Sequence, residues 1–182
     1  MLRLKSPGHE RLFQSPLLEA TFGGGEANVA VSLALLGMEA SYVTALSSDA
    51  VGDAALRSLR AQGVDVSRVR RTKERTGIYF LETGADQRAS NVVYDRAGSA
   101  AAAMKPGDFD WASILAGADW FHVTGITPAL SRSAAEAAIE AAAAARKAGA
   151  KVSVDLNYRK KLWNYGVAAP EGVSGSVNVT SA

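Results

Sequence analysis

Residues 119–156, DWFHVTGITPALSRSAAEAAIEAAAAARKAGAKVSVDL, decide the fold class of this chain. The segment begins and ends in short apolar runs, 119–123 and 151–156, that are almost continuous. Such runs are typical of strands that are buried on both faces of a sheet. An alanine-rich helix is predicted between them, at 133–148. A strand, a helix and a second strand in this order predict a βαβ unit, and therefore a mainly parallel sheet.

The ends of the central helix carry their own signals. Ser133 and Glu136 have the spacing of a capping box, in which two side chains bond free backbone N–H groups of the first turn. Arg146 and Lys147 lie in the predicted last turn, where positive charge is favourable, and Gly149 follows them. We therefore expect the helix to open with the Ser133 capping box and to stop at Gly149.

The same alternation occurs nearer the start of the chain. A helix is predicted at 26–36, a short buried strand at 41–46 and a second helix at 49–62. Residues 64–69 then return to extended structure. The α/β pattern thus extends over most of the chain.

Two segments near the middle of the chain, 76–82 and 90–94, are rich in β-branched and aromatic residues. The turn-prone residues 83–87 join them, so we predict an antiparallel hairpin. A hairpin does not fit inside a parallel sheet, and we expect it to form a small separate β layer. Residues 1–4 have the pattern of the second half of a strand.

The composition of the 182 residues excludes several classes of protein. The chain has no cysteine, which excludes a disulfide scaffold, a zinc–thiolate site and a cysteine nucleophile. It has no uninterrupted apolar run of about 18 residues, so we expect no membrane span. The net charge is only +2, and we expect no nucleic-acid partner. The start is too short and too charged for a secretion signal, and the absence of cysteine permits a reducing compartment, so we expect a cytoplasmic location.

The stretch FGGGEAN at 22–28 is the strongest local signal for a binding site. Glycines allow a close approach of the backbone to a ligand, and a helix N-terminus offers free N–H donors. Asn28 supplies both a donor and an acceptor for a sugar hydroxyl. The alternatives are a plain turn and a dinucleotide fingerprint, although Asn28 occupies the third glycine position of that fingerprint.

Tyr94, Asp95 and Arg96 follow one another at the end of the predicted hairpin. Arginine binds carboxylates through a bidentate fork, so Arg96 is a candidate ligand for an acidic substrate. Tyr79, on the partner strand, is a candidate for the same side of the sheet. The alternative for Arg96 is a solvated loop charge, and a solvated face is our interpretation of the basic stretch at 68–75.

The segment DLNYR at 155–159 follows a predicted buried strand at its carboxyl end, where open α/β sheets bind ligands. Asp155, Asn157 and Arg159 project the same way if the chain stays extended. A helix N-cap by Asp155 or Asn157 is the alternative. We interpret His122 as a core histidine. No cluster has the spacing of metal ligands, so we expect no metal site.

Taken together, these motifs resemble the ribokinase-like (PfkB) carbohydrate kinases from about residue 1 to residue 171. Among them, the segments 94–100, 121–126 and 155–163 resemble the branch that acts on 2-keto-3-deoxygluconate. The matching segments are 23–30 with Gly37, 49–53, 59–65, 76–80, 94–100, 121–126 and 155–163. Ser47 departs from the family pattern, which has glycine at this position.

The resemblance implies a fold and a set of binding residues. The fold is α/β, a ribokinase-like doubly wound parallel sheet, here partial, with a small β-sheet lid. Residues 1–171 form the N-terminal portion of one such domain, with lid segments near 10–22 and 76–96, and 172–182 form a divergent tail. By resemblance, the residues that bind the sugar are Gly24, Gly25, Asn28, Tyr79, Tyr94, Arg96 and Arg159. Asn157 and Arg159 are assigned to the nucleotide side in the same way.

The resemblance also implies ATP- and magnesium-dependent phosphorylation of 2-keto-3-deoxygluconate. In the family, the general base lies in a Gly-Ala-Gly-Asp motif, and an Asn-x-x-Glu motif assists with metal and phosphate. Neither string occurs in the 182 residues. We therefore expect a truncated kinase that holds no catalytic base, binds ATP and Mg²⁺ poorly and is inactive alone.

Several alternatives stay open. Within the kinases, the chain is a candidate fructokinase or 5-dehydro-2-deoxygluconokinase. Outside them, it is a candidate non-catalytic sugar-binding or interaction fragment, with homo-oligomers formed through the lid or an exposed sheet edge. A Rossmann dehydrogenase is the most distant alternative.

Overall fold

A computed structural model describes residues 1–158 of the 182-residue chain. Arg159 and the tail at 172–182 lie outside the described residues. The chain divides into two compact units, residues 1–100 and residues 101–182. Each unit is described by itself.

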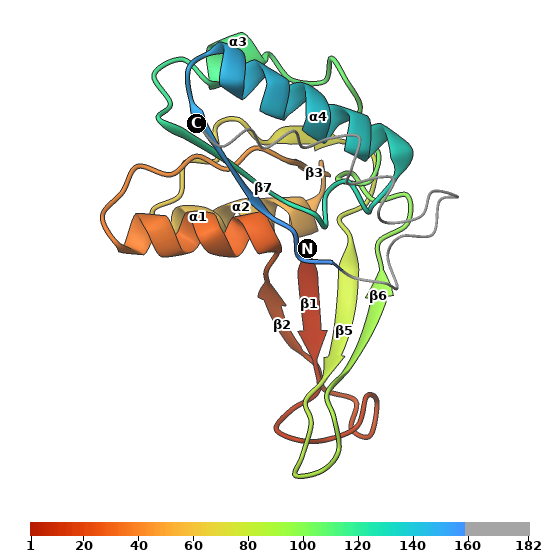
Figure 1. The fold of residues 1–182 in the computed structure, drawn as a ribbon. Helices are drawn as coiled ribbons and strands as arrows, with labels where there is room; N and C mark the ends of the chain where they lie inside the picture. Colours follow the sequence, from red (N-terminus) through yellow and green to blue (C-terminus); the bar gives the residue numbers. More distant parts are fainter. Residues whose placement is uncertain (159–182) are drawn as a thin grey trace. The chain divides into compact units, whose positions relative to one another are not determined.

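The first unit contains a four-stranded sheet in the order β2-β1-β5-β6 (Figure 1). Its strands are β1 (Leu2–Lys5), β2 (Glu19–Phe22), β5 (Ile78–Glu82) and β6 (Asn91–Asp95). β5 and β6 pair antiparallel, which confirms the predicted hairpin, and β1 pairs parallel with β5 and antiparallel with β2. The hairpin is therefore part of a mixed sheet.

The register of this sheet separates its residues into two faces. Arg3 lies opposite both Thr21 and Tyr79, and Tyr79 lies opposite Tyr94. Because side chains alternate along a strand, these four residues share one face. The next row, on the other face, is apolar and consists of Ala20, Leu4, Phe80 and Val93.

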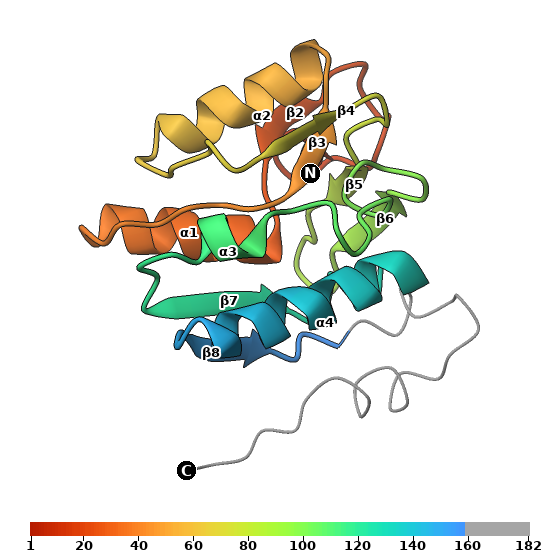
Figure 2. The same cartoon turned by 90° about the horizontal axis from the view of Figure 1, so that it is seen from above.

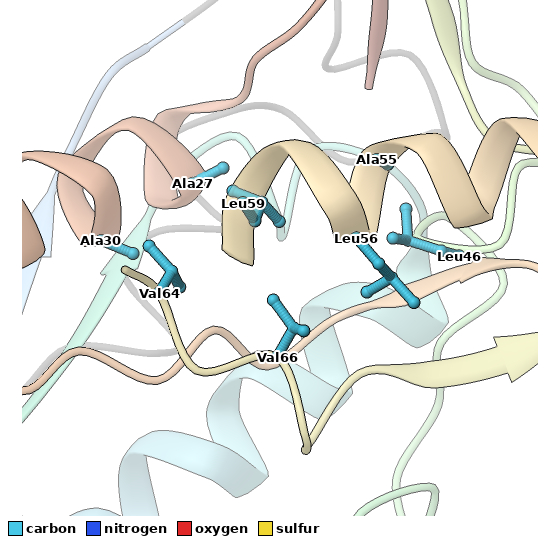
Figure 3. Packing of buried hydrophobic residues seen from close by; sticks show 8 residues of the cluster. All are labelled: Ala27, Ala30, Leu46, Ala55, Leu56, Leu59, Val64 and Val66. Atoms are coloured by element: carbon cyan, nitrogen blue, oxygen red, sulfur yellow. The ribbon is translucent and has the colours of Figure 1, made fainter. Parts of the chain in front are cut away.

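Beside the four-stranded sheet, the first unit has two helices and a parallel strand pair. The helices are α1 (Gly25–Leu35) and α2 (Ala50–Arg60), and the strands are β3 (Ala45–Ser47) and β4 (Arg70–Thr72). Apolar residues from α1, α2, β3 and the segment before β4 form the core (Figure 3). The buried members are Ala27, Ala30, Leu46, Ala55, Leu56, Leu59, Val64 and Val66.

The extended segments predicted at 41–46 and 64–69 differ from the structure. Ser41 forms only an isolated bridge with Asp65, and strand pairing begins at Ala45 and Arg70. The reason is a turn at Asp65, whose carboxylate accepts hydrogen bonds from the backbone N–H (2.8 Å) and the hydroxyl (3.0 Å) of Ser67. Such local side-chain bonds compete with strand pairing.

The second unit contains the predicted βαβ element. β7 (Trp120–Thr124) and β8 (Lys151–Asp155) pair in parallel, and α4 (Arg132–Lys147) connects them and packs on both (Figure 2). A short helix, α3 (Trp111–Ile114), precedes them. Leu115, Ala145 and Ala150 are the buried centre of this unit.

The predicted capping residue of α4 is wrong by two positions. The hydroxyl of Ser131, not of Ser133, accepts the hydrogen bond from the backbone N–H of Ala134, at 3.0 Å. Ser131 has an extended backbone (φ −169°, ψ 165°), and the helix begins at Arg132. Ser133 therefore lies inside the first turn, where its hydroxyl lies 3.1 Å from that of Ser131.

The described strands form three separate sheets, not one continuous parallel sheet. Parallel pairing still joins β3 to β4 and β7 to β8. The helix α2 lies between β3 and β4 in the chain, and α4 lies between β7 and β8. The α/β fold class is as predicted. No helix among residues 1–158 is both long enough and apolar enough to cross a membrane.

Candidate functional site

A glycine turn connects β2 to α1 and is the centre of the candidate site. The backbone of Gly24 is extended, and its carbonyl accepts a hydrogen bond from the N–H of Asn28 at 2.8 Å. No side chain caps the N-terminus of α1, which lies within the described residues. The first turn of α1 therefore presents backbone N–H groups at its positive end.

Asn28 and Tyr79 converge on this turn from different elements. A Cβ atom added at Gly23 would lie 3.6 Å from the hydroxyl oxygen of Tyr79 and 3.7 Å from the Oδ1 atom of Asn28. Tyr79 is on β5, and Asn28 is in the first turn of α1. The glycine thus leaves space between two polar groups that are suited to sugar hydroxyls.

Tyr94 and Arg96 extend the same face of the sheet. The rings of Tyr79 and Tyr94 are 6.1 Å apart, and the guanidinium carbon of Arg96 lies 4.1 Å from the centre of the Tyr94 ring. Arg96 is only 7% exposed. Because arginine keeps its charge when it is buried, the site holds a permanent cation on an aromatic ring.

Two further groups shape the electrostatics of this region. Glu26 is in the first turn of α1, where a carboxylate is favourable. The amino group of Met1 donates a hydrogen bond to the carbonyl of Gly23 at 2.8 Å. The pKa of this amino group is lowered to about 6, chiefly by burial and then by the charge of Arg96, while Glu26 acts in the opposite direction. The charges of Arg96 and Glu26 thus both shift the pKa of the Met1 amino group, which binds the glycine turn at Gly23.

The carboxyl ends of β7 and β8 form the second predicted location. The N–H of Gly125 donates to the carbonyl of Asp155 at 2.7 Å, and a Cβ atom at Gly125 would lie 2.2 Å from the carbonyl oxygen of Leu156. Only glycine permits this close approach. The two strand ends are therefore held tightly together.

The chain does not stay extended beyond β8, so the condition for Asp155 and Asn157 to project the same way is not met. Asn157 has a φ of 31°, and its N–H donates to the carboxylate of Asp155 at 3.1 Å. This is a local turn of the kind that aspartate and asparagine favour. His122, on β7, is partly buried and lies 3.1 Å from the hydroxyl of Ser153.

The predicted site residues fall into three groups. The first unit contains Gly24, Gly25, Asn28, Tyr79, Tyr94 and Arg96. Asn157 belongs to the second unit, and Arg159 lies outside the described residues. Within residues 1–158, no three His, Cys, Asp or Glu side chains come together as a set that would hold a metal ion.

The basic residues of the stretch at 68–75 are mostly exposed, as expected of a solvated face, and two of its arginines also bind partners elsewhere in the chain. Arg71 lies 2.7 Å from the carboxylate of Asp53 and donates to the carbonyl of Ser47 at 2.9 Å. Arg75 forms an ion pair with Asp95, next to Arg96. Charge spacing alone does not reveal these partners, because they are about twenty residues away along the chain.

Comparisons with known proteins agree on one family. The sequence matches the family model described as pfkB family carbohydrate kinase over residues 4–175. A 2-dehydro-3-deoxygalactonokinase from Haloferax volcanii is 37% identical over 164 residues, which cover 90% of this chain and 51% of the relative. A 2-dehydro-3-deoxygluconokinase from Bacillus subtilis is 34% identical over 142 residues, which cover 77% of this chain and 43% of the relative.

A solved structure matches a similar share of this chain. The crystal structure of 2-dehydro-3-deoxygluconokinase from Thermotoga maritima has a TM-score of 0.87 and 50% sequence identity. The match covers 90% of this chain and 50% of that chain. The chain thus spans about half the length of the relatives that it matches.

Proposed function

The chain belongs to the pfkB family of carbohydrate kinases, and from that premise we propose that it provides the sugar-binding part of a kinase for 2-dehydro-3-deoxygluconate, also called 2-keto-3-deoxygluconate. One observation carries the choice of substrate. A buried arginine, Arg96, lies on the same sheet face as two tyrosines that lead to the glycine turn. A sugar acid requires such a cation, whereas a neutral hexose does not.

In this proposal, each residue has a defined role. The amide of Asn28 and the hydroxyl of Tyr79 bind sugar hydroxyls beside Gly24 and Gly25. The guanidinium of Arg96 binds the carboxylate. Tyr94 supports Arg96 from one side and is 6.1 Å from Tyr79 on the other.

The transfer of phosphate requires groups that we do not assign to this part of the chain. ATP and Mg²⁺ supply the phosphoryl group and its charge neutralisation in kinases. Residues 1–158 offer no set of side chains that fits a metal ion, so we derive no step through it. Asn157 and Arg159 on the nucleotide side stay predictions.

A second substrate is favoured by a specific observation. The relative from Haloferax volcanii, 37% identical to this chain, is a 2-dehydro-3-deoxygalactonokinase. The two sugar acids differ only in the configuration at C4. Nothing in the roles of Asn28 and Arg96 selects between them, so 2-dehydro-3-deoxygalactonate is the second candidate.

Isothermal titration calorimetry tests the proposal. We expect the chain to bind 2-dehydro-3-deoxygluconate, and Arg96→Met to weaken binding about tenfold or more, because a charge-assisted hydrogen bond is worth about 1.5–3 kcal/mol. Arg57→Met on the exposed surface of α2 is the matched control and should bind as the original chain does.

The panel of ligands separates the candidates. 2-Dehydro-3-deoxygalactonate, 5-dehydro-2-deoxygluconate and D-fructose are titrated in parallel. Tighter binding of D-fructose than of either 2-dehydro-3-deoxy acid, or equal binding by the Arg96→Met variant, contradicts the proposal. Binding of no sugar, with self-association at rising concentration, favours an interaction fragment.

A further inference from the structure

Arg75 holds the backbone on both sides of Arg96. Its guanidinium forms an ion pair with the carboxylate of Asp95 and donates to the Asp95 carbonyl at 3.1 Å. It also donates to the carbonyl of Ala97 at 3.2 Å. The residue before Arg96 and the residue after it are thus bound by one side chain.

The chain around Arg75 fixes Arg96 from a second direction. The carbonyl of Arg75 accepts a hydrogen bond from the N–H of Ala100 at 2.9 Å, and the carbonyl of Arg96 accepts one from Ser99 at 3.1 Å. A Cβ atom added at Gly77 would lie 3.2 Å from the Cβ atom of Arg96. Arg96 therefore follows β6 in a tightly packed turn, and Arg75 binds the residue on either side of it.

We propose that Arg75 is a positioning residue that aims the Arg96 guanidinium at the carboxylate of a sugar acid. This inference rests on the proposed function and deepens it, because it adds a residue that decides between acidic and neutral sugars. Arg75 binds the carboxylate of Asp95, which strand alternation places on the other face of the sheet from Tyr94. It also keeps the end of β6 in the conformation that places Arg96 on the Tyr94 ring.

The geometry requires arginine in this position. Arg75 uses both terminal nitrogens of its rigid planar fork to reach a carboxylate and two carbonyls, whereas a lysine carries its three donors on a single nitrogen. The side chains of Arg75 and Asp95 are 41% and 54% exposed. Surface ion pairs of this kind contribute little to stability. Replacement of Arg75 should therefore affect binding much more than folding.

The hairpin provides a matched control at its opposite end. Arg88 also pairs with a carboxylate, that of Glu82 at 3.2 Å, and also donates to two carbonyls, those of His9 and Thr83. Arg75→Lys and Arg88→Lys are the same chemical change in the same kind of contact. Only the first of them lies beside Arg96.

The binding experiment compares two ligands by calorimetry on the full chain. The ligands are 2-dehydro-3-deoxygluconate and its analogue with a hydroxymethyl group in place of the carboxylate. We expect Arg75→Lys to weaken binding of the acid about tenfold and to leave binding of the alcohol unchanged, with a melting temperature close to that of the original chain. Arg88→Lys should change neither affinity. Equal weakening for both ligands, or no weakening for the acid, overturns the inference.

A second readout does not depend on any ligand. The side-chain N–H signal of Arg96, assigned by its loss in Arg96→Lys, should be displaced in the NMR spectrum by the ring current of Tyr94. We expect it to move towards the position of a solvent-exposed arginine in Arg75→Lys and to stay in place in Arg88→Lys. An unmoved signal in Arg75→Lys overturns the inference. If the original chain binds neither ligand, the proposed function fails, and this signal alone decides whether Arg75 orients Arg96.

Discussion

At the scale of single residues, the site depends on where side chains are absent as much as on where they are present. Gly23 leaves open the space between Tyr79 and Asn28, and Gly52 lets α2 start directly against the backbone of Ser47. The two glycines differ in what surrounds them. At Gly23 an added methyl group meets the ends of polar side chains, whereas at Gly52 it meets a carbonyl oxygen.

Gly23→Ala should weaken sugar binding without unfolding the chain. The added methyl group would lie in ordinary contact with Tyr79 and Asn28, at 3.6 and 3.7 Å, so it fits but fills the space between them. We expect an affinity loss of about tenfold or more for 2-dehydro-3-deoxygluconate by calorimetry. An unchanged affinity would remove Gly23 and its neighbours from the site.

Gly52→Ala should destabilise the first unit. Its Cβ atom would lie 2.0 Å from the carbonyl oxygen of Ser47, and a backbone atom has no alternative rotamer. We expect a loss of about 2–3 kcal/mol in the free energy of unfolding, measured by urea denaturation. Gly23→Ala is the control, since its methyl group causes no clash. Equal stability of the two variants would show that β3 and α2 meet differently.

At the scale of elements, the capping residues decide where helices begin. Asp49 caps α2 by accepting hydrogen bonds from the N–H groups of Val51 and Gly52, both at 3.0 Å, and from the hydroxyl of Ser47 at 2.6 Å. Ser47, at the position where the resemblance leads us to expect glycine, thus supports the cap, and its hydroxyl lies 2.7 Å from that of Thr76, the residue that precedes Gly77 and β5. The serine hydroxyl therefore has a partner both at the N-cap of α2 and in the segment before β5.

The cap of α2 should make stability sensitive to acid. The hydrogen bonds from Ser47 and Gly52 hold the pKa of Asp49 below its usual value of 3.8. Because the folded pKa is lower than the unfolded one, the contribution of this carboxylate is present above pH 3.8 and is lost as the pH falls through the folded value. Asp49→Asn should therefore flatten the acid side of a thermal stability curve. If the original chain and Asp49→Asn lose stability equally steeply below pH 3.8, the result would contradict the cap.

The cap of α4 can be tested with two neighbouring serines. Ser131 accepts the hydrogen bond from Ala134, and its hydroxyl also donates to the carbonyl of Ala102 at 2.7 Å. We expect Ser131→Ala to cost about 1–2 kcal/mol of unfolding free energy. Ser133→Ala is the matched control and should cost much less, because its hydroxyl caps no backbone group in the structure. A larger loss of unfolding free energy in Ser133→Ala than in Ser131→Ala would contradict this cap and favour the capping box at Ser133 and Glu136.

At the scale of the whole molecule, the pfkB match and the solved relatives confirm the ribokinase-like α/β fold class. We propose that the first unit supplies the side chains that bind the sugar, and the second unit contains a tight strand junction at Gly125. The general base and the phosphate cradle of a kinase are not among the groups that we assign to them. Binding and transfer of phosphate are therefore separable predictions for this chain.

The 182-residue chain should bind 2-dehydro-3-deoxygluconate without phosphorylating it. Stabilisation of the transferring phosphoryl group supplies most of the rate enhancement in kinases, and the chain lacks the Gly-Ala-Gly-Asp string that we expect to provide it. A coupled assay for ADP with ATP and Mg²⁺ should give only the background rate. The Thermotoga maritima enzyme serves as the positive control. Turnover above background by this chain would overturn the prediction of inactivity.

Much of the secondary structure followed from the sequence alone, because its signals are local. The helix of the βαβ unit, its flanking strands and the hairpin at Ile78–Glu82 and Asn91–Asp95 are formed by patterns that repeat within a few residues. The choice between Ser131 and Ser133 was not predictable in this way, because serine is a favoured N-cap at either position and the capping-box spacing to Glu136 indicated the wrong one. The choice depended on which residue before the helix is the last with an extended backbone, and that residue is Ser131.

Local patterns in the chain are enough to predict an α/β protein with a glycine turn before a helix and an arginine at the end of a hairpin. They do not predict that Tyr79 and Asn28 flank Gly23, or that Arg75 binds both neighbours of Arg96, which became visible in the folded chain. The physical reason is distance along the chain. Periodicity and capping act over a few residues, whereas the contacts of Tyr79 with Gly23 and of Arg75 with the neighbours of Arg96 join residues about 20 to 56 positions apart, which meet only when the sheet register is set.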